Sequence, residues 1–172
     1  MLSSVFLRRA EPGDEEAVAR VHVRSWQVAY RGLLPDDYLD RLSPADRAAR
    51  YTFAEIGPGS PHTTVAVGED GICGFTTSGP CRDADEDGAG ELYAIYVHPD
   101  WWNRGVGRLL IDDVRSRLSQ ERFSEAVLWV LVGNERAERF YRIDGWEPDG
   151  QRRLQDAHGL TVDEIRYSRS LI

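Results

Sequence analysis

The sequence predicts an α/β fold in which a mixed central β-sheet is flanked by helices. Three observations lead to this prediction: the 172 residues have the length of one domain, strand-like runs alternate with helical patterns, and hairpin signals precede a strand–helix–strand crossover. Since no repeat or linker divides the chain, we expect residues 1–172 to form a single domain.

The N-terminal third is expected to form one strand and three helices. Residues 5–9 have the pattern of a strand, and the helix that follows starts with acidic residues after a Pro-Gly pair. The residues that helical spacing places on one side of this helix are Ala17, Val18, Val21, Ser25 and Val28. A second, short helix is predicted over 35–42. Ser43 before Pro44 favours the start of a third helix, which we expect to end at Gly57.

A hairpin and an acidic loop are expected in the middle of the chain. Strands over 63–67 and 72–78 are separated by Glu-Asp-Gly, a hairpin turn signal. The loop that follows, 79–90, contains four acidic residues: Asp83, Asp85, Glu86 and Asp87. Their spacing lacks the ligand order of an EF-hand, so we expect no metal site there. A solvated loop is the simplest interpretation, and a mobile lid beside a neighbouring cleft is the alternative.

The second half of the chain is predicted to alternate strands and helices. The expected elements are a strand over 91–97, a helix over 105–118, a strand over 126–132, a short helix from Asn134, and closing strands over 146–154 and 160–168. Asn134 is a preferred N-cap residue, and Gly145 is suited to end the short helix. Ala137, Phe140 and Tyr141 share one face of that helix by their spacing.

The turn between the strand 91–97 and its helix is the most informative feature. It runs Trp-Asn-Arg-Gly-Val-Gly-Arg-Leu over 102–109. Gly105 and Gly107 leave the backbone unshielded, so the N–H groups of residues 103–109 can converge on an anion at the positive end of the helix dipole. Neither the P-loop pattern nor the dinucleotide-binding fingerprint fits this turn. We therefore expect a phosphorylated ligand of another kind, with plain helix capping as the alternative.

Two motifs together carry a resemblance to a known family. The first, V-x-P-x-x-x-x-R-G-V-G-R-x-L, starts at Val97, and the second, N-x-x-A-x-x-F-Y-x-x-x-G-W, starts at Asn134. In letters, order and separation they resemble the motifs of the GNAT superfamily of acetyl-CoA-dependent N-acetyltransferases. The stretch 22–35 is similar to one bacterial branch of that superfamily, so the resemblance covers nearly the whole chain.

The resemblance implies a GNAT-like fold in which strands 91–97 and 126–132 splay apart and hold acetyl-CoA. The residues that it implies for cofactor binding are Ile95, Val97, Asn103, Arg104, Gly105, Val106, Gly107, Arg108, Leu109, Asn134 and Tyr141. The backbone amide of Val97 would pair with the pantetheine arm, and the amides of the turn would hold the pyrophosphate. Trp102 stands where the superfamily usually has Gln or Arg, and a neighbouring arginine could supply the missing charge.

Acetyl transfer by direct attack needs a neutral amine and a proton for the departing thiolate. The resemblance implies that Tyr141 lies near the cofactor sulfur, and a phenol of pKa about 10 is matched well enough to a thiol of about 8.5 to stabilise or protonate it. Packing beside Phe140 is its alternative role. The resemblance also implies Glu91 as the base that accepts the amine proton through water, the alternative being an exposed glutamate at a strand entrance. Strict alternation would place Glu91, Tyr93 and Ile95 on one face of the sheet.

The amine acceptor stays open from the sequence. The candidates that the resemblance implies for its binding are Trp26, Tyr30, Glu91 and Tyr93, of which the first two are equally compatible with core positions. Polyamines, amino acids, antibiotics and protein N-termini all remain as acceptors. A catalytically silent acyl-CoA-binding or regulatory module with the same fold is the alternative function, and a homodimer is compatible with the resemblance.

Composition argues against several other classes. The net charge of −8 disfavours a nucleic-acid binder, and it favours cationic acceptors or serves solubility alone. The sequence has no apolar run that would span a membrane and no signal-peptide core, so we expect a soluble, cytoplasmic protein. Cys73 and Cys81 are expected to be free thiols, and the four scattered histidines indicate no zinc site.

Overall fold

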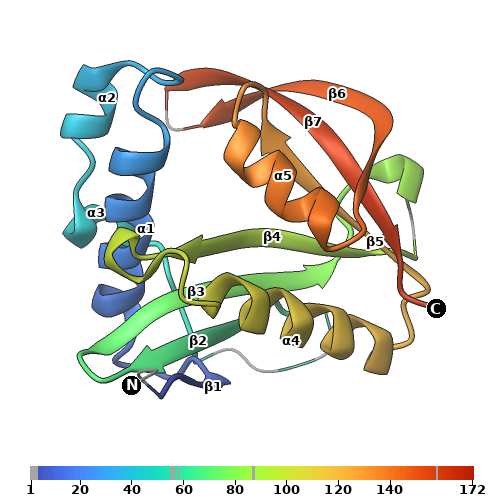
Figure 1. Cartoon of the computed structure of the whole chain (residues 1–172), viewed down its shortest axis with the longest axis horizontal. Coiled ribbons are helices and arrows are strands. Elements are labelled where there is room, and N and C mark those ends of the chain that lie inside the picture. The colour runs from blue at the N-terminus through green and yellow to red at the C-terminus, as the bar shows by residue number, and fades with distance from the viewer. Residues whose placement is uncertain (1–3, 55–56, 58, 87, 158) are drawn as a thin grey trace.

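The computed structural model describes residues 4–54, 57, 59–86, 88–157 and 159–172, and it has the predicted α/β fold (Figure 1). Its strands are β1 (Phe6–Arg9), β2 (His62–Gly68), β3 (Gly71–Pro80), β4 (Gly90–Val97), β5 (Glu125–Leu131), β6 (Glu147–Ala157) and β7 (Leu160–Ser170). Its helices are α1 (Glu15–Ala29), α2 (Asp36–Asp40), α3 (Pro44–Ala48), α4 (Val106–Gln120) and α5 (Glu135–Ile143), with short 3₁₀ turns η1 (Ala84–Glu86) and η2 (Pro99–Trp101). The strands form one mixed sheet in the order β1-β2-β3-β4-β5-β7-β6.

The strands β4 and β5 run parallel and are joined only at their starts. The paired positions are Gly90 with Ala126, Glu91 with Val127 and Leu92 with Leu128. Beyond them, β4 continues to Val97 and β5 to Leu131, and no further pairing joins the two strands in the described structure. The prediction that these parallel strands splay apart is therefore confirmed.

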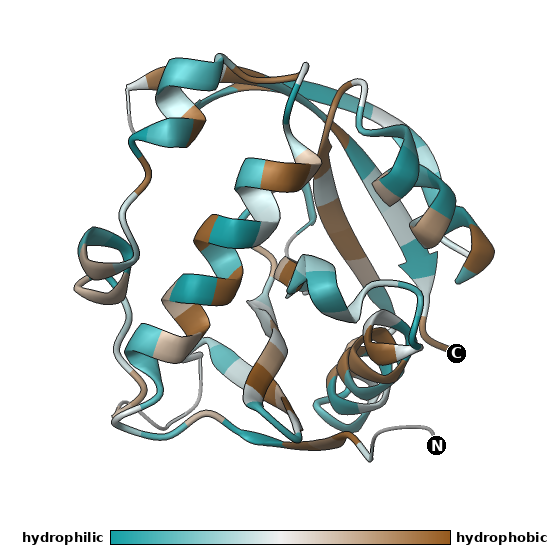
Figure 2. Cartoon of the chain, turned by 60° about the vertical axis from the view of Figure 1, so that its left-hand side comes forward, coloured by the Kyte–Doolittle hydropathy of each residue, from teal (hydrophilic) through white to brown (hydrophobic). Residues whose placement is uncertain are grey.

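Helices cover both faces of the sheet. The helix α1 packs on one face and α4 on the other, because Val65 joins the α1 cluster while its neighbour Ala66 joins the α4 cluster. The helix α5 lies on the same face as α4, since Tyr141 shares a cluster with Ile111. Figure 1 shows α1, α2 and α3 together at one end of the sheet, with α4 below β4 and α5 above it. In Figure 2, hydrophobic and hydrophilic positions alternate along α1 and α4, as expected for helices with one buried side.

The third helix is shorter than predicted. Within the described residues, α3 stops well before Gly57, and the predicted helical positions 55–56 lie outside the description. Tyr51 and Phe53 pack in the same core cluster. Residues two apart lie on different sides of a helix but on the same side of an extended chain, so burying both rings ends the helix.

A bulge in β4 breaks the alternation of its side chains. The register between β3 and β4 skips Tyr93, which has no partner on β3. Ile95 consequently packs on the α4 side of the sheet, in the same cluster as Leu92. Under strict alternation these two residues would lie on opposite faces. The prediction that Glu91, Tyr93 and Ile95 share one face is therefore wrong.

The acidic loop after β3 is tied to the sheet. Arg166 of β7 is only 3% exposed and donates hydrogen bonds to Asp83 and Asp85. Asp83 also accepts a hydrogen bond from the indole Nε1–H of Trp129, at 2.9 Å. A buried arginine needs such partners, so these carboxylates anchor the loop to the sheet, while Asp85 remains exposed to solvent as expected. Asp87 lies outside the described residues.

Three expectations about the whole chain can be compared with the structure. Cys73 and Cys81 are free thiols, as predicted. Within the described ranges, no three His, Cys, Asp or Glu side chains come together as metal ligands. None of the helices described combines the length and the apolar character that a membrane crossing requires.

Candidate functional site

A cavity of about 850 Å³ opens where β4 and β5 separate. The predicted site residues that line it are Trp26, Tyr30, Glu91, Tyr93, Ile95, Val97, Asn103, Gly105, Val106, Gly107, Arg108, Asn134 and Tyr141. Arg104 and Leu109 are not part of the lining. The guanidinium of Arg104 lies over the ring of Trp101, and Leu109 is exposed on α4. The splayed strands thus bring most of the predicted residues to one space.

The turn before α4 presents free backbone N–H groups to one end of this cavity. Gly105 has a left-handed φ of +82°, and the first helical hydrogen bond runs from the N–H of Leu109 to the carbonyl of Gly105, at 3.1 Å. The N–H groups of Val106, Gly107 and Arg108 therefore have no partner within the helix. The first turn of α4 has no acidic residue to compete for them. The geometry of these three N–H groups suits an anion. The N–H of Leu109, also predicted to bind the anion, is instead bonded to the carbonyl of Gly105.

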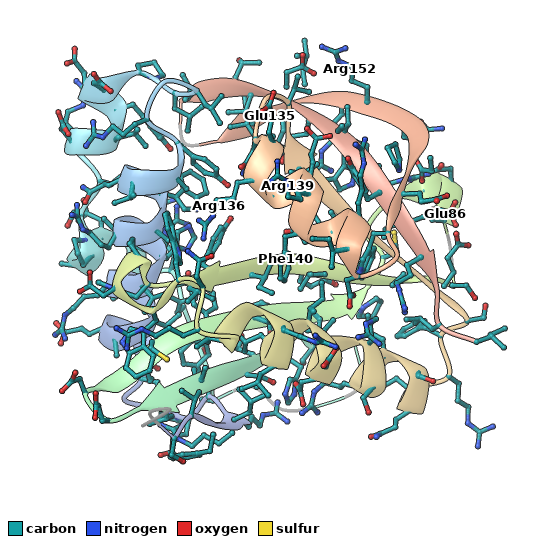
Figure 3. All side chains as sticks on the ribbon, viewed as in Figure 1. Glu86, Glu135, Arg136, Arg139, Phe140 and Arg152 are labelled. Carbon is teal, nitrogen blue, oxygen red and sulfur yellow. The ribbon has the colours of Figure 1, made fainter. Side chains whose placement is uncertain are left out.

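Gly107 allows α5 to approach α4 closely. A Cβ atom at this position would lie 3.2 Å from the ring of Phe140. Figure 3 shows Phe140 on the side of α5 that faces α4. The helix α5 begins where predicted, because the side chain of Asn134 accepts a hydrogen bond from the N–H of Ala137, at 3.3 Å. Gly107 and Asn134 both line the cavity, and Arg136 near the start of α5 lies over Trp102 of the turn before α4, so we call this part of the cavity the anion end.

Arginines gather at the anion end. Arg108 on α4 lines it, together with Arg136 and Arg139 on α5, which are labelled in Figure 3. Over its whole surface the cavity is lined by six arginines and two glutamates, although the chain carries a net charge of −8. The sequence signal that could have marked Arg136 and Arg139 is their three-residue spacing on a helix, which makes them neighbours.

Trp102 connects the turn to the end of β4. Its indole Nε1–H donates a hydrogen bond to the carbonyl oxygen of Val97, at 2.8 Å, and the guanidinium carbon of Arg136 lies 3.5 Å from the centroid of its ring. The N–H of His98 bonds to the carbonyl of Cys73, at 2.8 Å. Because bonding alternates along an antiparallel ladder, the N–H of Val97 points away from β3, toward the gap between β4 and β5.

Tyr141 lines the cavity from α5. Its ring centroid lies 5.5 Å from that of Phe140 and 6.2 Å from that of Tyr167. Burial raises the pKa of its phenol above the usual 10, so the hydroxyl stays protonated at neutral pH. Tyr141 packs in the core and also borders the cavity, so the packing role and the catalytic role are compatible.

Glu91 is buried and paired with Arg82. The residue is 1% exposed, and its carboxylate accepts hydrogen bonds from Nη2 (2.7 Å), Nε (3.3 Å) and the backbone N–H (3.0 Å) of Arg82. The alternative of an exposed glutamate is therefore wrong. Arg82 also lies over the ring of Tyr93, at 4.0 Å, and the hydroxyl of Tyr93 donates to the carbonyl of Pro80. Tyr93 therefore lines the cavity with its ring, while its hydroxyl proton is taken up by the hydrogen bond to Pro80.

An aromatic wall borders another part of the cavity, formed by His22 and Trp26 of α1, by Tyr30 just after that helix, and by Tyr96 of β4. The ring of Trp26 lies 5.0 Å from those of His22 and Tyr30 and 6.1 Å from that of Tyr96, between centroids. Burial raises the pKa of Tyr30 and Tyr96. Trp26 and Tyr30 also pack against a hydrophobic cluster, so the core role and the lining role coexist in both.

Glu164 of β7 is a second carboxylate in the lining, and no sequence pattern marks it. Its Oε1 accepts a hydrogen bond from Nε of Arg153, at 3.0 Å. Burial is the largest cause of the raised pKa of Tyr30 and of Tyr96, and the negative charge of Glu164 is a smaller cause in both. Glu164 therefore lies near the aromatic wall. Sheet pairing brings it there, because Glu164 is the partner of Leu131 on β5.

Comparisons with known proteins agree on one family. Residues 22–146 match the profile of the acetyltransferase (GNAT) family. The uncharacterized N-acetyltransferase YuaI of Bacillus subtilis is 34% identical over 131 residues, which cover 76% of this chain and 73% of that protein. The PaiA N-acetyltransferase of Thermoplasma acidophilum, solved with coenzyme A, superposes with a TM-score of 0.70 at 17% identity over 97% of this chain and 99% of that one. YncA of Salmonella typhimurium, solved with acetyl-CoA, superposes with a TM-score of 0.71 at 18% identity over 99% of this chain and 95% of that one.

Proposed function

Because the chain belongs to the acetyltransferase (GNAT) family, we propose that it transfers the acetyl group of acetyl-CoA to a primary amine, with both substrates bound together. The observation that carries this proposal is the shape of the cavity. Free N–H groups at the start of α4 border one end, and the aromatic wall and two carboxylates border the rest. A volume of about 850 Å³ leaves room for two ligands to meet beside Tyr141.

The residues present fit acetyl-CoA. The free N–H groups at the start of α4 suit a pyrophosphate, and Arg108, Arg136 and Arg139 add positive charge for its phosphate groups. The N–H of Val97 and the side chain of Asn134 are the proposed partners of the pantetheine arm. When bound, acetyl-CoA supplies a thioester that an amine can attack directly.

Tyr141 is the proposed proton donor to the departing sulfur. Its phenol is protonated at neutral pH, since burial raises its pKa further above the usual 10. A positioned acid of this kind contributes to rate by transferring its proton as the sulfur leaves. The ring is fixed by Phe140 and Tyr167, which keeps the hydroxyl in one place.

The attacking amine must first lose a proton. An alkyl amine of pKa about 10.4 is mostly protonated at pH 7, and removing the proton costs about 4–5 kcal/mol. Glu91 is the proposed acceptor of this proton through a water molecule. Arg82 fixes its carboxylate, while Oε2 takes only one hydrogen bond from Arg82 and has a lone pair left. Glu164 is proposed to attract the charged amine, because Arg153 donates to its Oε1 and not to its Oε2.

A panel of amines tests the proposal. The protein is incubated with acetyl-CoA and with polyamines, amino acids, amine antibiotics or peptides, and the free thiol released is measured. Direct acetyl transfer predicts thiol release that depends on the amine. If acetyl-CoA raises the Tm of the protein but no amine releases thiol, the chain is the catalytically silent acyl-CoA-binding module instead.

The proposal extends to a cytoplasmic homodimer. Light scattering tests the assembly, because a dimer has twice the chain mass of 19.5 kDa. A measured mass equal to that of one chain would contradict it.

A further inference from the structure

One part of the cavity has more positive charge than its carboxylates neutralise. We call this part the acceptor end, and it is lined by the aromatic wall together with Arg47, Arg82, Glu91, Arg153 and Glu164. Glu91 is paired with Arg82 at 2.7 Å, and Glu164 with Arg153 at 3.0 Å. Arg47 has no carboxylate within 4.0 Å in the described part of the chain. Among the residues that the structure describes, the acceptor end therefore carries one arginine without a carboxylate partner.

Arg47 lies beside the aromatic wall, at the end of α3. Its guanidinium carbon is 6.0 Å from the centroid of the Trp26 ring. Burial raises the pKa of Tyr51 and Tyr96, and the positive charge of Arg47 acts in the opposite direction on both. Of these two phenols only Tyr96 lines the cavity, whereas the hydroxyl of Tyr51 pairs with Nδ1 of His22. Arg47 is also half-buried, so water screens its charge less than that of an exposed arginine.

This arrangement favours one kind of acceptor chemically. Guanidinium N–H groups are donors that bind a carboxylate, and Arg47 offers them beside the aromatic wall. A polyamine or a lysine side chain would instead bring a second cation toward Arg47, where like charges repel. A molecule with both an amine and a carboxylate can place its amine toward Glu164 or Glu91 and its carboxylate toward Arg47.

We propose that the acceptor is an amino acid, a molecule with a free carboxylate beside its amine, and that Arg47 binds this carboxylate. The inference rests on the proposed function and narrows the acceptors that the sequence leaves open. It departs from the expectation of a cationic acceptor, which followed from the net charge of −8. The lining of the cavity, with its six arginines and two glutamates, has the opposite sign to the chain as a whole.

The test compares each amino acid with its C-terminal amide and with the amine that lacks the carboxyl group. Thiol release at saturating acetyl-CoA gives kcat/KM for each compound. We expect the best acceptor to be a free amino acid, with kcat/KM about 10- to 100-fold above that of its amide, the range for one charge-assisted hydrogen bond. Arg47→Ala should lower kcat/KM for the acid to the value for the amide and leave the amide unchanged. Arg47→Lys should restore part of the difference.

Arg24→Ala is the matched control, since Arg24 is an exposed arginine of α1 outside the cavity lining. It should leave the acid and the amide unchanged. The rise in Tm caused by acetyl-CoA should persist in Arg47→Ala, which shows that the variant folds and binds the cofactor.

The outcomes separate this inference from the proposed function. Amides or polyamines that react as well as acids would overturn the inference alone, as would an Arg47→Ala variant that affects acid and amide equally. If acetyl-CoA binds and no amine of any class reacts, the proposed function fails and this inference fails with it.

Discussion

The indole Nε1–H of Trp102 donates a hydrogen bond of 2.8 Å to the carbonyl oxygen of Val97. This bond ties the turn before α4 to the last residue of β4. The ring also carries the guanidinium of Arg136, 3.5 Å from its centroid. The residue that departs from the superfamily pattern therefore supports the turn from β4 and holds a cation beside it.

Removing this indole N–H should weaken the binding of acetyl-CoA. Trp102→Phe keeps a ring for Arg136 but loses one neutral hydrogen bond, so we expect the Kd for acetyl-CoA to rise about 2- to 10-fold. Trp102→Ala removes the ring as well and should raise the Kd further. Isothermal titration measures both. Trp129→Phe is the control, because its indole bonds to Asp83 near the acceptor end, and an equal effect in both Phe variants would refute a specific role for Trp102.

Tyr141→Phe removes only a hydroxyl. We expect kcat to fall about 10- to 1,000-fold while the Kd for acetyl-CoA stays the same, because a general acid acts in the chemical step. Tyr167→Phe is the matched control, since its hydroxyl donates to Glu138 at 2.6 Å and it does not line the cavity. Single-turnover rates make the comparison where chemistry is limiting. Equal rates for the parent and Tyr141→Phe would reduce Tyr141 to a packing residue.

The two glutamates of the cavity should respond differently to pH. Glu91→Gln should depress kcat most near neutral pH, and raising the pH should rescue it because the amine then arrives neutral. Glu164→Gln should raise KM for the amine, with little rescue of kcat. Both pH–rate profiles are recorded at saturating acetyl-CoA. If the profile of Glu91→Gln overlays that of the parent, Glu91 is not the base, and if Glu164→Gln shows the rescue, that role belongs to Glu164.

His62 should make the stability of the fold depend on pH. Burial, followed by the charges of Arg117 and Arg9, lowers its pKa from the usual 6.5 to about 4. Between these values the unfolded chain binds more protons at His62 than the native state, so the free energy of unfolding decreases as the pH falls from 6.5 to about 4. His62→Gln should lose part of this decrease. Urea denaturation at about pH 7 and about pH 4.5 measures it, and identical decreases in both proteins would assign the effect to other groups.

Features set by neighbouring residues could be predicted from the sequence. Asn134 caps α5 through a residue three positions away, and Gly145 follows the end of that helix with a φ of +89°. The turn before α4 depends on Gly105, which adopts the left-handed φ that its place before a helix requires. Each of these needs only local chemistry, so the strand–turn–helix order around the cavity followed from the residues alone.

Features set by distant partners could not be predicted. The bulge at Tyr93 depends on the register of β3, and the end of α3 depends on where Tyr51 finds core space. Arg47 and Glu164 reach the same cavity from helix α3 and strand β7, which no spacing in the sequence relates. The charge of the acceptor end is therefore a property of tertiary packing.

Mass spectrometry of the protein and the amine in one reaction tests direct acetyl transfer most directly. The protein is first mixed with acetyl-CoA alone, and an amino acid acceptor is then added. Direct attack in a complex of both substrates predicts that the protein mass stays unchanged throughout, and that one acetylated amine forms for each coenzyme A released. A protein that gains an acetyl group from acetyl-CoA alone, or acetyl-CoA that binds and stays intact with every amine, would contradict it.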